Sequence, residues 1–199
     1  MHEMRSPIAA TITSGRFGAV EDGAEARLTL AETAPKSLVQ IAGWQDFEAA
    51  VGPLLDHLGL ALPDDFRTAA ASDDGAHHLF RLAPGRLLLA SGTAAPALLA
   101  DVPASDRLAT LDITHGRWIV EATGPALEDF LHRLAPVDFR EASLPAGAFV
   151  QTAINKVSVL IWRTGRDRAR ILFPTSSTRW LWAYITDVAT PLGYEVSVP

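Results

Sequence analysis

The fold is decided by residues 108–136, which read LATLDITHGRWIVEATGPALEDFLHRLAP. Alternating apolar and polar positions predict two strands here, Leu108 to Thr114 and Arg117 to Ala122, which turn at His115-Gly116. Gly124-Pro125 then opens a helix, because proline is well suited to the first helical position. That helix carries an apolar stripe at helical spacing, made of Leu127, Phe130, Leu131 and Leu134. The stretch therefore predicts strand, strand, helix.

The same order of elements is expected on both sides of this stretch. Before it we expect a helix after Asp46, kinked or restarted at Pro53. The remaining elements are predicted from period-2 or helical spacing. The strands are Arg27 to Glu32, Ser37 to Trp44, His77 to Leu82, Arg86 to Ser91, Phe149 to Arg163 and Arg170 to Pro174, and the helices are Ala95 to Ala100 and about Ser177 to Val188.

This order predicts an α+β fold made of two topologically similar β-β-α-β-β-α halves with antiparallel sheets. The first half spans residues 26–104 and the second spans residues 105–199. No residue-level identity connects the two halves, so the repeat is one of topology alone. Residues 1–25 show no sustained period, and we expect a loosely ordered N-terminal arm that a partner fixes in place.

Composition limits the class of function. The chain has a net charge of −6, which argues against nucleic acid as a partner, because a phosphate backbone requires a basic face. The densest basic stretch, Arg163 to Arg170, reads as a solvated hairpin turn rather than a phosphate site. There is no cysteine, so thiolate chemistry and disulfides are excluded. Apolar residues reach 48%, and a subunit that buries surface against a partner explains this better than a monomer.

The sequence also bears on location. The N-terminal stretch lacks an apolar core of signal-peptide length, and the longest apolar runs are far below membrane-spanning length. We therefore expect a cytoplasmic protein that does not bind a membrane.

No catalytic or metal motif stands out. The histidines are placed singly or, in one strand, on opposite faces, so a structural or solvated role is favoured over catalysis. The paired carboxylates lie in polar loops or in the first turn of a helix, where acids favour the dipole. These groups are His57, His77, His78, His115 and His132, with Asp64-Asp65, Asp73-Asp74 and Glu128-Asp129. We expect no catalytic, cofactor-binding or metal-ligating residue in this chain.

The last helix has the most unusual predicted surface. Trp180 and Trp182 flank an apolar side that contains Tyr184, so the apolar arc spans roughly 200°, against the roughly 100° that covers a core. Such a helix is either sunk between layers or partly covered by another chain, and Trp and Tyr are enriched at interfaces. Trp180, Trp182 and Tyr184 are therefore our candidate partner interface, the alternative being that both indoles cover a core edge.

Ordered landmarks in the second half carry a resemblance to a known family. They are LDITHGR at 111–117, Gly-Pro at 124–125, Pro-Val-Asp at 136–138, VLIWR at 159–163 and PTSSTRWLW at 174–182. In order and spacing they resemble the γ subunit of the heterotetrameric sarcosine oxidases. That subunit is a distant, shortened relative of the folate-binding aminomethyltransferases, such as the T-protein of glycine cleavage.

The resemblance implies a structural subunit without an active site of its own, in a complex that demethylates sarcosine oxidatively to glycine. Larger α and β subunits would carry the flavins, the dinucleotide NAD and tetrahydrofolate. Aminomethyltransferases have an acidic pair in the strand where this chain reads Asn155 to Leu160, a stretch without a carboxylate. Three alternatives stay open: a small subunit of an N-methylglutamate dehydrogenase complex, a stand-alone folate-binding protein of the aminomethyltransferase type, and an autonomous homodimer with an unrelated function.

Overall fold

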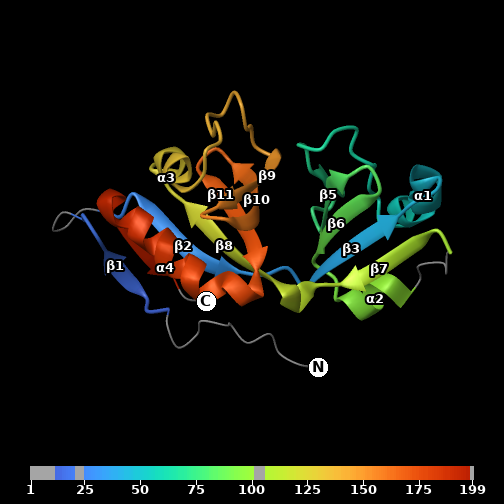
Figure 1. The fold of residues 1–199 in the computed structure, drawn as a ribbon, viewed down its shortest axis with the longest axis horizontal. Coiled ribbons are helices and arrows are strands. Elements are labelled where there is room, and N and C mark those ends of the chain that lie inside the picture. The colour runs from blue at the N-terminus through green and yellow to red at the C-terminus, as the bar shows by residue number, and fades with distance from the viewer. Residues whose placement is uncertain (1–11, 21–24, 101–105, 198–199) are drawn as a thin grey trace. The chain divides into compact units, whose positions relative to one another are not determined.

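The computed structural model of the chain describes residues 12–20, 25–100 and 106–197. Their contacts divide the chain into two compact units. Unit 1 contains the described residues up to Thr33 and those from His115 onward, and unit 2 runs from Ala34 to Thr114. Each unit is built on one sheet, and the elements are labelled in Figure 1.

Unit 1 contains a seven-stranded sheet in the order β1-β12-β2-β8-β11-β10-β9. The pair of β12 with β2 is parallel, and the other neighbours are antiparallel, as the sequence predicts for the sheets as a whole. The strands are β1 (Gly15–Phe17), β2 (Leu28–Thr33), β8 (Arg117–Thr123), β9 (Phe149–Ile154), β10 (Val157–Gly165), β11 (Arg168–Pro174) and β12 (Tyr194–Ser197).

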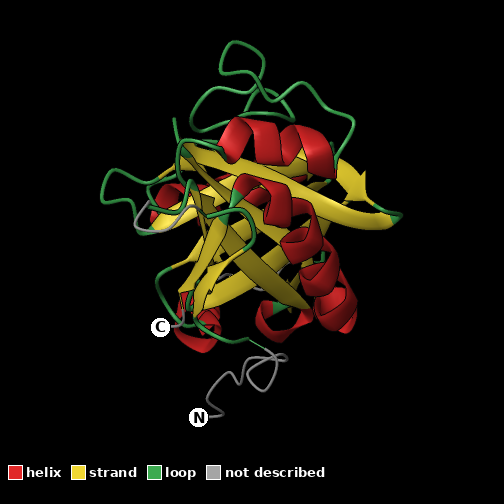
Figure 2. Ribbon diagram, turned by 90° about the vertical axis from the view of Figure 1, so that its left-hand side faces the viewer, coloured by secondary structure: helices red, strands yellow, loops and turns green. Residues whose placement is uncertain are grey.

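Two helices, α3 (Leu127–Leu134) and α4 (Thr178–Ala189), cover one face of this sheet, and short 3-10 turns lie at Thr114–Gly116, Thr175–Ser177 and Thr190–Leu192. In Figure 2 red helices lie in front of the yellow strands. The predicted stripe of α3 is confirmed, since all four of its members are buried in the core of unit 1. The same core takes alternate residues of the strands, including Leu28, Val120 and Ile171. Alternate positions of a strand point to the same face of a sheet, so these residues share the face that the helices cover.

The start of α3 shows why glycine precedes proline there. Gly124 has a φ of 125°, and a Cβ on it would lie 2.4 Å from the carbonyl oxygen of Arg27. The N–H of Ala126 donates to that same oxygen at 3.0 Å. Only glycine allows so close an approach. The Gly-Pro pair therefore joins the entry of α3 to the beginning of β2, which is distant in sequence.

Unit 2 contains a five-stranded sheet in the order β4-β5-β6-β3-β7. Helix α1 buries Phe47, Val51, Leu54 and Leu55 in the core of this unit. The helix is not restarted at Pro53, and Asp46 takes the N-cap position with a φ of 49° but without a side-chain capping bond. The elements are β3 (Ser37–Gly43), α1 (Phe47–His57), β4 (Ala70–Ala71), β5 (His77–Ala83), β6 (Arg86–Ser91), α2 (Ala95–Ala100) and β7 (Leu108–Asp112).

The expected division into halves at residues 26–104 and 105–199 differs from the observed one. Strands β2 and β3 follow each other in sequence but belong to different sheets, and so do β7 and β8. Strand β2 pairs with β8 and β12, whereas β7 pairs with β3. Each unit thus takes one strand from the other expected half. Sequence periodicity indicates that a strand exists, but pairing is decided by long-range contacts that periodicity does not contain.

The expected N-terminal arm is corrected where the structure describes it. Gly15–Phe17 form β1, which pairs antiparallel with the C-terminal strand β12. The segment is therefore paired with the chain's own sheet. Three residues are too few for a periodic signal in the sequence. Residues 1–11 and 21–24 of the predicted arm lie outside the described residues.

The single strand expected from Phe149 to Arg163 is also wrong. Asn155 and Lys156, with φ of 43° and 74°, turn the chain between β9 and β10. Two consecutive residues with positive φ are the geometry of a tight two-residue hairpin, which matches the twist of its strands. Asparagine tolerates a positive φ, but lysine is not typical of such a turn, so the sequence does not mark Asn155-Lys156 as a hairpin.

Candidate functional site

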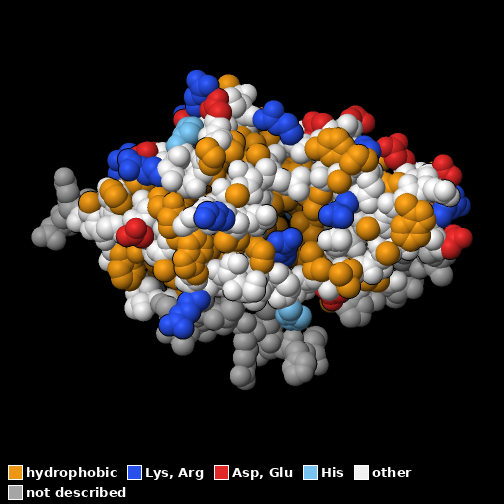
Figure 3. Space-filling view, viewed as in Figure 1, with side chains coloured by type: hydrophobic (Ala, Val, Ile, Leu, Met, Phe, Trp, Pro, Cys, Tyr) orange, Lys and Arg blue, Asp and Glu red, His pale blue; other side chains and the backbone are white. Residues whose placement is uncertain are grey.

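The outward side of α4 carries a large exposed aromatic side chain. Trp180 is 46% exposed, and its ring stacks on that of half-buried Tyr184 with centroids 5.7 Å apart and planes 9° apart. Figure 3 shows apolar side chains gathered over the part of unit 1 where α4 lies in Figure 1. A stacked pair that is partly open to solvent presents a flat, rigid aromatic surface. We take this pair as the candidate interaction site.

Trp182, the third residue of the predicted interface, lies elsewhere. It is buried in the core of unit 1, and its ring meets the edge of Trp118 at a centroid distance of 5.7 Å. Trp118 in turn contacts Phe173 at 5.2 Å, and its indole N–H donates to Glu32. Consecutive even positions on a helix point about 200° apart, so Trp180 and Trp182 cannot share one surface. Trp180 therefore remains a candidate for the interface, whereas Trp182 is a core residue.

A small groove lies beside α4. It measures about 260 Å³ and is lined by Thr13, Phe17, Trp182, Ala183, Thr186, Tyr194 and Val196. Phe17 of β1 stacks on Tyr194 of β12, with ring centroids 5.4 Å apart. Burial raises the pKa of the Tyr194 hydroxyl. Spacing along the sequence does not predict this groove, because Phe17 and Tyr194, which stack in it, come from opposite ends of the chain.

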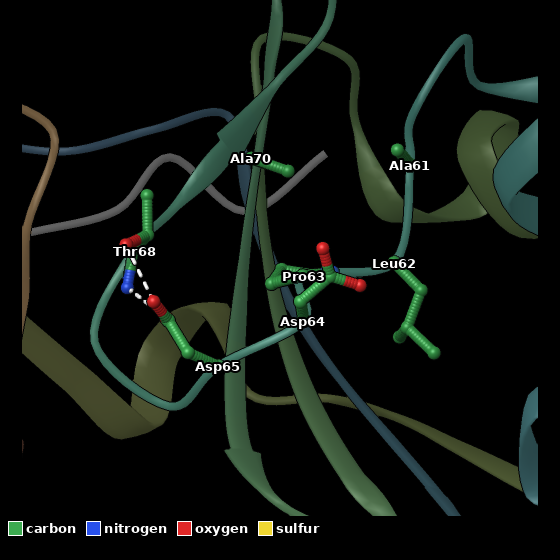
Figure 4. Close-up of a pocket in the computed structure, with 7 residues that line it drawn as sticks. All are labelled: Ala61, Leu62, Pro63, Asp64, Asp65, Thr68 and Ala70. Atoms are coloured by element: carbon green, nitrogen blue, oxygen red, sulfur yellow. Dashed lines mark hydrogen bonds between the residues drawn. The ribbon is translucent and has the colours of Figure 1, made fainter.

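A second cavity, of about 280 Å³, lies in unit 2 and is shown in Figure 4. Its loop contains the predicted carboxylate pair Asp64-Asp65. The Asp65 carboxylate accepts hydrogen bonds from the N–H groups of Arg67 and Thr68 and from the Thr68 hydroxyl. These bonds lower the pKa of Asp65. A carboxylate that holds its own loop together in this way acts as a turn former, which agrees with the interpretation of this pair as a solvated turn.

The other polar candidates hold local structure. The His132 ring accepts the N–H of Phe139 at 3.1 Å, and the His77 ring lies 2.9 Å from the Ser91 hydroxyl. The guanidinium of Arg140, with help from Ser143, holds the pKa of Asp138 well below its usual range. In residues 12–20, 25–100 and 106–197, no three His, Asp or Glu side chains gather as metal ligands would. That the chain has no catalytic, cofactor or metal residue stays a prediction.

Within the described part of the chain, no helix is long and apolar enough to cross a membrane.

Comparison with known sequences gives one consistent answer. No family model matches the chain. It is 25% identical over 140 residues to the sarcosine oxidase subunit gamma of an Arthrobacter species, covering 67% of this chain and 68% of that one. It is 26% identical over 148 residues to the subunit gamma of Corynebacterium sp. strain P-1, covering 71% of this chain and 70% of that one.

Comparison with solved structures shows a likeness of fold. The glycine cleavage system aminomethyltransferase T of Bartonella henselae has a similar fold, with a TM-score of 0.59 and 17% identity, over 87% of this chain and 48% of that one. A chain of the heterotetrameric sarcosine oxidase from Corynebacterium sp. U-96 matches more fully, with a TM-score of 0.79 and 24% identity, over 94% of this chain and 95% of that one. The resemblance to the sarcosine oxidase γ subunits is thus confirmed in both sequence and fold.

Proposed function

We propose that this chain is a non-catalytic structural γ-like subunit of a heterotetrameric, flavin-dependent sarcosine oxidase. The observation that carries the proposal is the match of nearly the whole fold to a chain of such an oxidase. Sequence similarity to two γ subunits supports it independently. In this proposal the larger α and β subunits hold the flavins, NAD and tetrahydrofolate and demethylate sarcosine to glycine, in the cytoplasm. The γ-like chain holds none of these cofactors and is required for assembly.

The test is purification of the tagged chain from its native host. Two larger subunits that co-purify in fixed ratio, with flavin absorbance and sarcosine oxidation, are the expected result. A colourless chain that purifies alone under gentle conditions would contradict the subunit role. Activity towards N-methylglutamate in place of sarcosine would instead identify the related dehydrogenase complex.

The stand-alone folate-binding alternative has the aminomethyltransferase-like fold in its favour. Fold similarity at 17% identity does not carry over the chemistry. The stretch Asn155 to Leu160, expected to hold the acidic pair of that family, contains no carboxylate and forms the turn and start of β10. Saturable binding of tetrahydrofolate by the purified chain would revive this alternative.

We place the partner contact of the subunit on the stacked pair Trp180 and Tyr184. Large apolar side chains that stay exposed on a folded unit are typical centres of protein interfaces. The proposed interface contains two of the three predicted residues, because Trp182 is buried in the core of unit 1.

The interface test compares Trp180→Glu with Trp44→Glu, a matched control because Trp44 is 64% exposed and lies in unit 2. Trp180→Glu should weaken assembly with the large subunits by roughly tenfold or more, as loss of a central aromatic contact does. Trp44→Glu should leave assembly unchanged. Equal effects of the two variants, or no effect of Trp180→Glu, would contradict the placement on α4.

A further inference from the structure

Unit 2 carries nearly all of the net charge of the chain. Residues 34–114 contain ten Asp and Glu residues and five Lys and Arg residues, a net charge of −5, whereas the whole chain has −6. Figure 3 shows acidic side chains over the part of the chain that forms unit 2 in Figure 1. A surface of one charge sign attracts a partner of the opposite sign and speeds its association. A partner that contacts unit 2 is therefore expected to be basic at the contact.

The cavity of unit 2 shown in Figure 4 gives this negative charge a defined position. Its seven lining residues all belong to unit 2, so the cavity is formed by this unit alone. Apolar side chains and the exposed Asp64 both line it. The hydrocarbon stem of a lysine or arginine packs on apolar surface while its charged end reaches a polar group. The cavity offers a place for both parts. The apolar lining residues are Ala61, Leu62, Pro63 and Ala70.

Asp64 differs from the neighbouring Asp65 in having no role in the loop. The Asp65 carboxylate is occupied by the hydrogen bonds that form the turn. Within residues 12–20, 25–100 and 106–197, the Asp64 carboxylate makes no hydrogen bond or ion pair. Dashed lines in Figure 4 join Asp65 to Thr68, and none reaches Asp64. The Asp64 carboxylate is therefore available to a ligand.

Arg81 of β5 holds the loop of the cavity in position. One of its terminal nitrogens donates to the carbonyl oxygen of Pro63 at 3.0 Å, and the other donates to Glu48 at 2.6 Å. Its guanidinium carbon also lies 5.3 Å from the centre of the Phe66 ring. Glu48 matches the charge of Arg81, so that of Asp64 stays uncompensated by this cation. A loop that is already held loses little conformational entropy when a ligand binds.

We propose that this cavity is a docking site for a basic side chain, lysine or arginine, of a large partner subunit. Small-molecule sites bury most of the surface of their ligand. This cavity is too open for that, because four of its seven lining residues are exposed, so a side chain anchored on a protein surface fits it better. The exposed lining residues are Ala61, Asp64, Asp65 and Thr68. The proposal rests on the subunit role, but it is independent of the aromatic pair on α4.

The experiment measures how fast the large subunits dissociate from the immobilised full chain, by surface plasmon resonance at several salt concentrations. Asp64→Lys should speed dissociation by roughly tenfold or more, because like charges then meet in the contact. The difference from the wild type should shrink as salt rises, since salt screens charges. The matched control is Asp56→Lys, because Asp56 is exposed on α1 in the same unit and does not line the cavity. Asp56→Lys should dissociate like the wild type, and thermal unfolding checks that both variants are folded.

The other outcomes separate the docking site from the subunit role. Wild-type dissociation in Asp64→Lys, or equal acceleration in both variants, would overturn docking at the cavity and leave the subunit role intact. A wild-type chain that binds no large subunit would overturn both proposals. Calorimetric titration of the isolated chain with n-butylamine tests the small-molecule alternative. Saturable binding that is lost in Asp64→Lys, with assembly unaffected, would assign the cavity to a small amine and overturn docking.

Discussion

Helices α3 and α4 pack against each other on the same face of one sheet, yet their outward sides differ completely. The outward side of α3 is charged, with Asp129 and Arg133 paired at 3.0 Å one turn apart. The outward side of α4 instead presents Trp180 stacked on Tyr184. A charged outer side suits contact with water, whereas an aromatic one is typical of contact with protein. The difference supports the proposal that a partner subunit covers the outward side of α4 and leaves that of α3 in contact with water.

The largest expected effect tests the inward side of α4. Trp182→Ala should lower the free energy of unfolding by about 3–5 kcal/mol, because it empties a buried aromatic site against Trp118. Denaturant unfolding measures this loss. Phe130→Ala on α3, fully buried in the same core, should cost a similar amount. A loss below about 1 kcal/mol for Trp182→Ala would mean that this indole is not a core residue.

The next effect concerns the loop that follows α3. Arg163 is buried, and its guanidinium donates to the carbonyl oxygens of Phe139, Leu144, Gly165 and Arg166. Arg163→Met should destabilise unit 1 by about 3 kcal/mol, because buried carbonyl groups lose their donors. Arg166→Met, at an exposed position in the same turn, is the control and should change stability by less than about 0.5 kcal/mol. Equal unfolding midpoints for both variants would contradict this role of Arg163.

A smaller effect is expected on the outward side of α4. Trp180→Ser should change the free energy of unfolding of the isolated chain by less than about 0.5 kcal/mol, since surface substitutions rarely do more. Chemical denaturation of the isolated chain measures this. If Trp180→Ser also weakens assembly with the large subunits, the outward side of α4 acts in partner binding and the inward side acts in folding. A loss comparable to that of Trp182→Ala would show that Trp180 acts in folding.

The smallest effect depends on pH. The ion pair with Arg140 depresses the pKa of Asp138 in the folded chain, so its stabilising effect is present above the unfolded pKa of about 3.9 and is lost as pH falls through the folded value. Asp138→Asn should therefore lower the Tm at pH 7, and the gap to the wild type should close in strongly acidic solution. Thermal scans across this range measure it. A gap that is constant with pH would exclude the carboxylate charge as the cause.

Local chemistry explains which features could be predicted from the sequence. The stripe of α3 and the positions of most strands follow from spacing over several residues, and the structure contains them. Strand β1 is too short for such a signal, and the turn at Asn155-Lys156 has no glycine or proline to mark it. At the candidate site, the broad apolar arc of the last helix predicts Trp180, Trp182 and Tyr184 alike, and it does not reveal that Trp182 is buried in the core.

The amino-acid sequence by itself determined the alternation of strands and helices, the acidic character of the chain and the resemblance to the sarcosine oxidase γ subunits. Each of these depends on residue type, local spacing or motif order. Only the tertiary structure decided that β2 joins β8 and β12 while β3 joins β6 and β7. Only the tertiary structure placed Trp182 inside and Trp180 outside. Pairing and burial depend on contacts between distant residues, and the energy of such contacts cannot be read from any single window of sequence.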